Sequence, residues 1–207
     1  MDDVLSMIAA AVAGYLIGTF PTAALVTRLA TRGRVDIRDV GSGNPGGFNT
    51  MHAVGTGWGV LVILVDIAKG AVAALVGWAI GGTPGAYAGA TAGIVGHIVP
   101  VWSGFRGGKG VATSAGAVLA VFPIFFPVDA AAAAVGALGF RNAERAIWLT
   151  CPLWIVSGIV WWLADLPNLW GPEPTVGLAI FAVVSAVIIL AKFAASRPRT
   201  AAPNPSA

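Results

Sequence analysis

The fold is decided by residues 96–113, whose sequence is G-H-I-V-P-V-W-S-G-F-R-G-G-K-G-V-A-T. One apolar segment leads into this stretch through His97, and another apolar segment leaves it. Between them, residues 104–110 combine four glycines with Arg106 and Lys109. Glycine lets backbone N–H groups close on an anion because no Cβ keeps the anion away, and the two cations add full charge. Taken alone, such a loop is more often a positive turn between two membrane helices.

The composition is that of an integral membrane protein. Of the 207 residues, 57% are hydrophobic and only 10% are charged, and the mean hydropathy is +0.83. Soluble domains carry about 25% charged residues. We therefore predict a single polytopic membrane domain over residues 1–195. Residues 196–207 are rich in proline and alanine and are predicted to form a disordered tail.

Seven apolar runs predict an all-α membrane fold with about seven transmembrane helices. They cover residues 4–27, 57–80, 86–103, 111–122, 124–140, 147–164 and 175–194. A straight span needs roughly 20 residues, so the run 111–122 is short for a crossing. Pro123 and Pro127 interrupt residues 111–140, and we expect two helices that meet at Phe122–Pro127. A six-span fold, with 111–140 as one kinked helix, is the alternative.

The charges set the expected orientation. With seven spans, every Lys and Arg except Lys69 falls on one side, so the positive-inside rule places the N-terminus outside and the C-terminus in the cytoplasm. Six spans would move Arg141 and Arg145, or the C-terminal cations, outside. Asp2 and Asp3 stand where a signal peptide carries Lys or Arg, so we expect a retained first helix. The net charge of +3 indicates no nucleic-acid partner, because the cations lie in short loops beside hydrophobic spans.

A second glycine-rich segment, residues 35–50, reads V-D-I-R-D-V-G-S-G-N-P-G-G-F-N-T. Its glycines permit tight turns, and its serine, asparagines and threonine offer neutral hydrogen bonds. Alone, such a run is most often just a turn. The predicted topology places it on the same membrane face as residues 104–110. Two glycine-rich loops on one face, one neutral and one cationic, can form a single pocket for a phosphate.

Three ionisable residues fall within or beside the predicted spans. Asp66 and Lys69 are three residues apart and share a helix face. An intramembrane charge is costly and functional by default, but we favour a mutually neutralising pair that supports the loops. Two roles for His97 are given equal weight: a buried imidazole that hydrogen-bonds to a carbonyl, and a side chain that contacts the substrate. The three residues are also the only support for a small transporter or channel component, for which we see no internal repeat.

Together, these segments resemble the bacterial membrane acyl-phosphate:glycerol-3-phosphate acyltransferases. The likeness runs from Tyr15 to about Thr113 and includes Y-L-I-G-T-F-P at 15–21, D-I-R-D-V-G-S-G-N-P-G at 36–46, D-I-A-K-G at 66–70 and the 96–113 stretch. The resemblance implies transfer of a fatty acyl group from acyl phosphate to glycerol 3-phosphate, giving lysophosphatidic acid for phospholipid synthesis. It also implies a bacterial inner-membrane protein with seven helices, cytoplasmic motif loops and no cofactor.

The resemblance also implies which residues act. Ser42 and Lys109 would hold the phosphate of the acyl donor and carry the catalysis. The other motif positions implied to bind substrate are Gly43, Asn44, Gly46, Asn49, His97, Gly107, Gly108 and Gly110. Arg106 and His52 are further candidate substrate contacts, and Asp66 and Lys69 are expected to support the site.

The chain departs from this family at three places. Gly47 and Phe48 stand where the family usually has Ala-Thr, and His52 stands where it has arginine. The family ends with a motif rich in His, Arg, Asn and Glu, whereas residues 192–199 read K-F-A-A-S-R-P-R. These parts belong to the acceptor site in the family. A relative that keeps the acyl-phosphate pocket but uses another acceptor, or none, is therefore the alternative.

The proposed chemistry asks little of the protein. An acyl phosphate is a mixed anhydride with a good leaving group, so stabilisation of developing charge and orientation of the acceptor are the main tasks. Lys109 and the glycine N–H groups suit the first task. The sequence has two histidines, one cysteine, no H-E-x-x-H and no G-x-S-x-G, so neither a metal site nor a serine-hydrolase mechanism is expected.

Overall fold

The computed structural model describes residues 3–138 and 143–196, and these residues contain helices and loops but no strand. The helices are α1 (Asp3–Gly18), α2 (Thr22–Ala30), α3 (Gly47–Ala53), α4 (Thr56–Ile98), α5 (Val111–Val121), α6 (Phe126–Leu138), α7 (Ala143–Leu163) and α8 (Val176–Ala195), with the 3₁₀ turns η1 (Val101–Ser103) and η2 (Pro123–Phe125). Four helical segments are long and apolar enough to cross a membrane, namely Asp3–Ala30, Thr56–Ser103, Ala146–Leu163 and Val176–Ala195. The expected all-helical class is confirmed.

The longest helix, α4, consists of two halves that fold back on each other. Gly81 and Gly82 have non-helical backbone angles, and Gly82 adopts a φ of 59° that favours glycine. Beyond this turn, Gly85 lies against the carbonyl oxygen of Gly77, and Gly89 lies against that of Ala73. The halves correspond to the predicted runs 57–80 and 86–103. Small residues let their backbones touch, as is common between membrane helices.

The first predicted run, residues 4–27, is not one helix. α1 ends at Gly18 and α2 begins at Thr22, because Pro21 has no N–H and cannot continue the hydrogen-bond ladder of α1. Before the break, α1 packs closely on the second half of α4, where a Cβ on Gly18 would meet the carbonyl oxygen of Gly93. The predicted apolar run 4–27 therefore contains two helices within one candidate membrane span, and the break leaves irregular backbone beside α4.

The segment 111–138 forms two helices, as expected. α5 ends at Val121, η2 follows, and α6 begins at Phe126, so the alternative of one kinked helix is wrong. The loop before α8 covers the end of α5, where the Asn168 side-chain amide donates to the Val121 carbonyl at 2.9 Å and the Trp170 indole donates to the Leu119 carbonyl at 2.9 Å. These bonds satisfy carbonyls that the helix end leaves unpaired.

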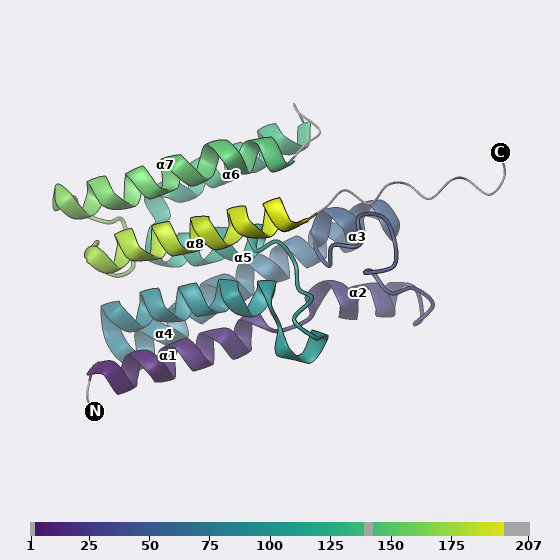
Figure 1. Ribbon diagram of the computed structural model, residues 1–207, viewed down its shortest axis with the longest axis horizontal. Coiled ribbons are helices and arrows are strands. Elements are labelled where there is room, and N and C mark those ends of the chain that lie inside the picture. Colours follow the sequence, from purple (N-terminus) through teal and green to yellow (C-terminus); the bar gives the residue numbers. More distant parts are fainter. Residues whose placement is uncertain (1–2, 139–142, 197–207) are drawn as a thin grey trace.

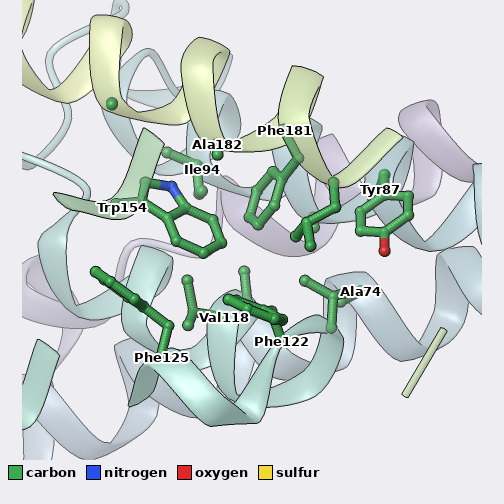
Figure 2. Packing of buried hydrophobic residues seen from close by; sticks show 14 of the residues in the cluster. Ala74, Tyr87, Ile94, Val118, Phe122, Phe125, Trp154, Phe181 and Ala182 are labelled. Carbon is green, nitrogen blue, oxygen red and sulfur yellow. The ribbon is translucent and has the colours of Figure 1, made fainter. Parts of the chain in front are cut away.

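An aromatic core joins α4, α5, α7 and α8 (Figure 2). The Trp154 ring lies 5.0 Å from the Phe125 ring and 5.6 Å from the Phe181 ring, measured between centroids. Its indole N–H donates to the Ser185 hydroxyl at 3.0 Å, so the buried polar atom has a partner. Cys151 packs in the same cluster, as the sequence predicts for a cysteine in an apolar run.

Both glycine-rich loops lie at one end of the helix bundle (Figure 1). α1 starts at the opposite end, where Ser6 lies beside Gly81, and α8 runs toward the loop end. The described cations other than Lys69 gather at the loop end, as the orientation argument requires. Arg141, Arg197, Arg199, Asp2 and the predicted tail beyond Ser196 lie outside the described residues, and the side chain of Arg145 is not described.

Candidate active site

A polar cleft lies where α1 breaks off before α2. Four separate segments line it: the break itself, the first glycine-rich loop, α4 and the second glycine-rich loop. The lining residues are Gly18 to Ala24, Arg38, Pro45, Asp66, Lys69, His97, Pro100, Ser103, Arg106, Gly107 and Gly108. The break matters because it supplies backbone carbonyls and side chains that a continuous helix would hide.

Asn49, at the start of α3, holds the first loop in shape. Its side-chain nitrogen donates to the carbonyls of Ile37 and Val40, both at 3.0 Å, and its oxygen accepts from the Ser42 backbone N–H at 2.9 Å. The Asn49 side chain is only 5% exposed. Gly41 has a φ of 57°, and a Cβ at this position would collide with the side-chain oxygen of Asn49. Asn49 was expected to contact substrate, but its hydrogen bonds are made within the loop.

The first loop uses its own N–H groups internally. Gly43 donates to the Val40 carbonyl at 3.0 Å, Gly46 to the Asn44 carbonyl at 2.9 Å, and the Asn44 N–H to the Ser42 hydroxyl at 3.4 Å. Ser42 is exposed and is not among the residues that line the cleft. The first loop thus contributes Arg38 and Pro45 to the cleft, rather than a ring of free N–H groups.

The second loop folds back on the end of α4. Gly107 donates to the Ile98 carbonyl and Gly108 to the His97 carbonyl, each at 3.1 Å. A Cβ on Gly108 would meet the imidazole of His97 and would lie 3.0 Å from the Pro45 carbonyl oxygen. The two loops therefore lie against each other, as predicted from topology. The loop can pack this closely only because residues 107 and 108 are glycines, since a Cβ on either would collide with its neighbours. The N–H groups of both glycines point toward carbonyls at the end of α4.

A buried charged group forms the floor of the cleft. The Lys69 ammonium lies 2.8 Å from the Asp66 carboxylate and donates to the Phe20 carbonyl in the break at 3.1 Å. His97 Nδ1 lies 3.8 Å from the same carboxylate. These three side chains are 2–8% exposed. The predicted pairing of Asp66 and Lys69 on one helix face is confirmed. Both residues also line the cleft, so the pair is part of the cleft surface as well as a support for it.

The cleft carries a net positive charge. Arg38, Lys69 and Arg106 line it, and Asp66 is the single acid among its lining residues. At its outer edge, Arg38 lies 3.7 Å from the Asp36 carboxylate. Such a site suits an anion that accepts several hydrogen bonds. Arg38 was predicted only as one of the charges on the cytoplasmic side, although its place in the D-I-R-D-V segment beside the glycines also indicated a site residue.

Eight expected site residues are absent from the cleft lining: Ser42, Gly43, Asn44, Gly46 and Asn49 of the first loop, and also His52, Lys109 and Gly110. The Lys109 ammonium stands 4.1 Å above the centre of the Phe193 ring on α8, a cation–π contact. Gly110, with φ 83°, precedes the first residue of α5. His52 is exposed in the last turn of α3.

An apolar groove adjoins the cleft on the outer side of α1 and the first half of α4. Its volume is about 440 Å³, and it is lined by Leu16, Ile17, Thr19, Phe20, Pro21, Val65, Ala68, Lys69, Val72 and Trp102. The indole N–H of Trp102 donates to the Thr19 hydroxyl at 3.0 Å. Thr19, Phe20, Pro21 and Lys69 also line the cleft, so the two depressions adjoin each other.

Known proteins share this sequence and this fold. The family model described as glycerol-3-phosphate acyltransferase matches residues 8–202. The glycerol-3-phosphate acyltransferase of Maricaulis maris is 37% identical over 199 residues, which are 86% of this chain and 90% of that protein. That of an Anaeromyxobacter species is 46% identical over 127 residues, covering 59% of this chain and 61% of that protein.

Two crystal structures of PlsY (YgiH), an integral membrane glycerol 3-phosphate acyltransferase, have the same fold. Both give a TM-score of 0.69 at 29% identity; the glycerol 3-phosphate form covers 91% of this chain and 88% of PlsY, and the lysophosphatidic acid form covers 90% and 87%. The fold and the sequence together define an integral membrane acyltransferase. The chain belongs to the glycerol-3-phosphate acyltransferase family. The resemblance is confirmed, and the family match extends well beyond Thr113.

Proposed function

We propose that this chain transfers a fatty acyl group from acyl phosphate to a hydroxyl of glycerol 3-phosphate, giving lysophosphatidic acid. The observation that carries the proposal is the position of a cationic cleft directly beside an apolar groove, with four lining residues in common. Acyl phosphate has both parts, an anionic head and an apolar chain. Family membership supports the same substrates, since the related PlsY structures are described with glycerol 3-phosphate and with lysophosphatidic acid.

In this proposal the acyl chain lies along the groove and the phosphate groups lie in the cleft. Val65, Ala68 and Val72 give the groove an apolar wall, and Trp102 stands at its border with the cleft. The acceptor hydroxyl forms the new ester bond at the acyl carbon as the bond to the leaving phosphate breaks, and the leaving phosphate takes up the proton of that hydroxyl. The developing charge is on phosphate oxygen, where Arg38 and Arg106 stabilise it, and electrostatic stabilisation is usually the largest catalytic term.

Ser42 and Lys109 remain candidate ligands of the donor phosphate. The resemblance supports this role, and the two residues belong to the two glycine-rich loops, which lie at one end of the bundle. In the described geometry Lys109 contacts Phe193 and Ser42 faces outward. Binding of phosphate by Lys109 therefore requires its ammonium group to leave the Phe193 ring, a movement that its four-carbon side chain permits.

We also propose seven membrane crossings, with the N-terminus outside and both loops facing the cytoplasm of a bacterial cell. The helices α1, α5, α6, α7 and α8 and the two halves of α4 supply the crossings. The gathering of cations at the loop end supports this orientation.

The direct test is an assay of the purified protein with acyl phosphate and labelled glycerol 3-phosphate, in which lysophosphatidic acid and free phosphate are both measured. Equal amounts of the two products are expected. Phosphate release without lysophosphatidic acid would favour the alternative of an altered acceptor, which the exposure of His52 outside the cleft supports. No consumption of acyl phosphate would refute both functions.

A further inference from the structure

A buried threonine hydroxyl in the cleft has no role in the scheme above. Thr22 is the first residue of α2, is 2% exposed and lines the cleft beside the helix break. Among the described residues, its Oγ1 has no hydrogen-bond partner. Leaving a buried hydroxyl unpaired is unfavourable, and because this one lines the cleft it is available to a bound ligand.

The position of Thr22 denies its hydroxyl a common partner within a helix. Threonines inside a helix commonly donate to the carbonyl four residues earlier. Three threonines here do so at 2.8 Å: Thr31 to Thr27, Thr91 to Tyr87, and Thr150 to Ala146. For Thr22, the residue four positions earlier is Gly18, which belongs to α1 on the other side of the break.

The neighbouring threonine in the same break makes the contrast clear. Thr19 also lines the cleft, but its hydroxyl donates to the Leu16 carbonyl at 2.6 Å and accepts from Trp102 at 3.0 Å. Thr19 is therefore occupied in holding the break and the border of the groove. Thr22 is the threonine of the break whose hydroxyl remains for a ligand.

The charges around Thr22 indicate the ligand class. Arg38, Lys69 and Arg106 line the same cleft, with Asp66 as the only acid in that lining. An anionic ligand with several acceptor oxygens is the natural partner of these cations and of a hydroxyl donor. We propose that the Thr22 hydroxyl donates a hydrogen bond to a phosphate oxygen of a bound substrate and so contributes to substrate affinity. The identity of that substrate rests on the proposed function.

The chain contains a matched control for this proposal. Thr27, five residues later on α2, is 0% exposed and, within the described residues, its hydroxyl also lacks a partner. It is absent from the cleft lining. Thr22→Val and Thr27→Val make the same nearly isosteric change in the same helix. Since valine removes an unpaired buried hydroxyl, both variants should be at least as thermally stable as the wild type.

The expected results separate substrate contact from structural support. Thr22→Val should raise the KM of one substrate about 10- to 100-fold, the loss expected for a hydrogen bond to a charged group. Thr22→Ser should restore it, and Thr27→Val should leave it unchanged. A rise for glycerol 3-phosphate assigns Thr22 to the acceptor, and a rise for acyl phosphate assigns it to the donor. Unchanged KM values for both substrates in Thr22→Val, or an equal rise in Thr27→Val, would overturn the proposal.

A binding measurement keeps the proposal testable if the proposed reaction is absent. Inorganic phosphate, titrated against the purified protein, should raise the Tm of the wild type and of Thr27→Val. It should raise the Tm of Thr22→Val much less at the same concentration. If Thr22→Val does not fold, Thr22→Ala takes its place. An equal shift in the Thr22 variant, or no shift in the wild type, would overturn the proposal, whereas absence of acyl transfer alone would refute only the proposed function.

Discussion

Replacing Lys69 by methionine tests how the floor of the cleft is held together. Methionine has a similar volume, but it leaves the Asp66 carboxylate, 2% exposed, without the ammonium group that lies 2.8 Å away. Removing one partner of a buried ion pair costs about 3–5 kcal/mol, because the remaining charge stays desolvated. The change also removes the donor to the Phe20 carbonyl in the helix break.

This loss should be visible in thermal unfolding. At about 2–4 °C per kcal/mol for a chain of this size, the Tm of Lys69→Met should fall by about 6–20 °C. Tryptophan fluorescence in detergent micelles measures it. The control is the double variant Asp66→Leu with Lys69→Met, which removes both charges and should recover most of the stability. A single variant as stable as the wild type, or a double variant no more stable than the single one, would refute the reasoning.

Three further outcomes are expected. Arg106→Ala should raise substrate KM about 10- to 100-fold by removing a charged donor, with a smaller rise for Arg106→Lys; equal KM values would exclude Arg106 from binding. Val72→Trp should reduce transfer of long acyl chains more than short ones by filling the groove, whereas Leu75→Trp, at an exposed position, should not; chain-length profiles decide. In intact cells, a membrane-impermeant thiol reagent should label the cysteine of Asp3→Cys but not the cysteine of Ser196→Cys; labelling at position 196 from outside would contradict the topology.

The helices were largely predictable because hydropathy records which segments avoid water. The break at Thr19–Pro21 was missed for the same reason, since the apolar run continues through it and hides the proline signal. The turn at Gly81 and Gly82 was implied only by a gap between two runs. Hydropathy locates a segment in the membrane, but it does not indicate where the helical hydrogen bonds of the backbone are interrupted within that segment.

The proximity of the two glycine-rich loops was predicted, whereas the direction of their N–H groups was not. The meeting of the two loops followed from topology and glycine content. The direction of the N–H groups of Gly107 and Gly108 depends on carbonyls of α4, which no local pattern specifies. Thr22 was not predicted as a site residue because it lies within an apolar run, and its hydroxyl lines the cleft only because the helix breaks just before it. Contacts between distant segments decide these features, so a reading of local motifs cannot supply them.

The described residues that line the cleft all fall between Gly18 and Gly108. The helices α7 and α8 meet the rest of the bundle through the aromatic core around Trp154 and through the contact of Phe193 with Lys109. The N-terminal half of the chain therefore supplies the lining of the cleft, and α8 packs against that half. Changes at residues 192–196 can therefore reach the cleft through the charge of Lys192, which acts on His97, and through the contact of Phe193 with Lys109.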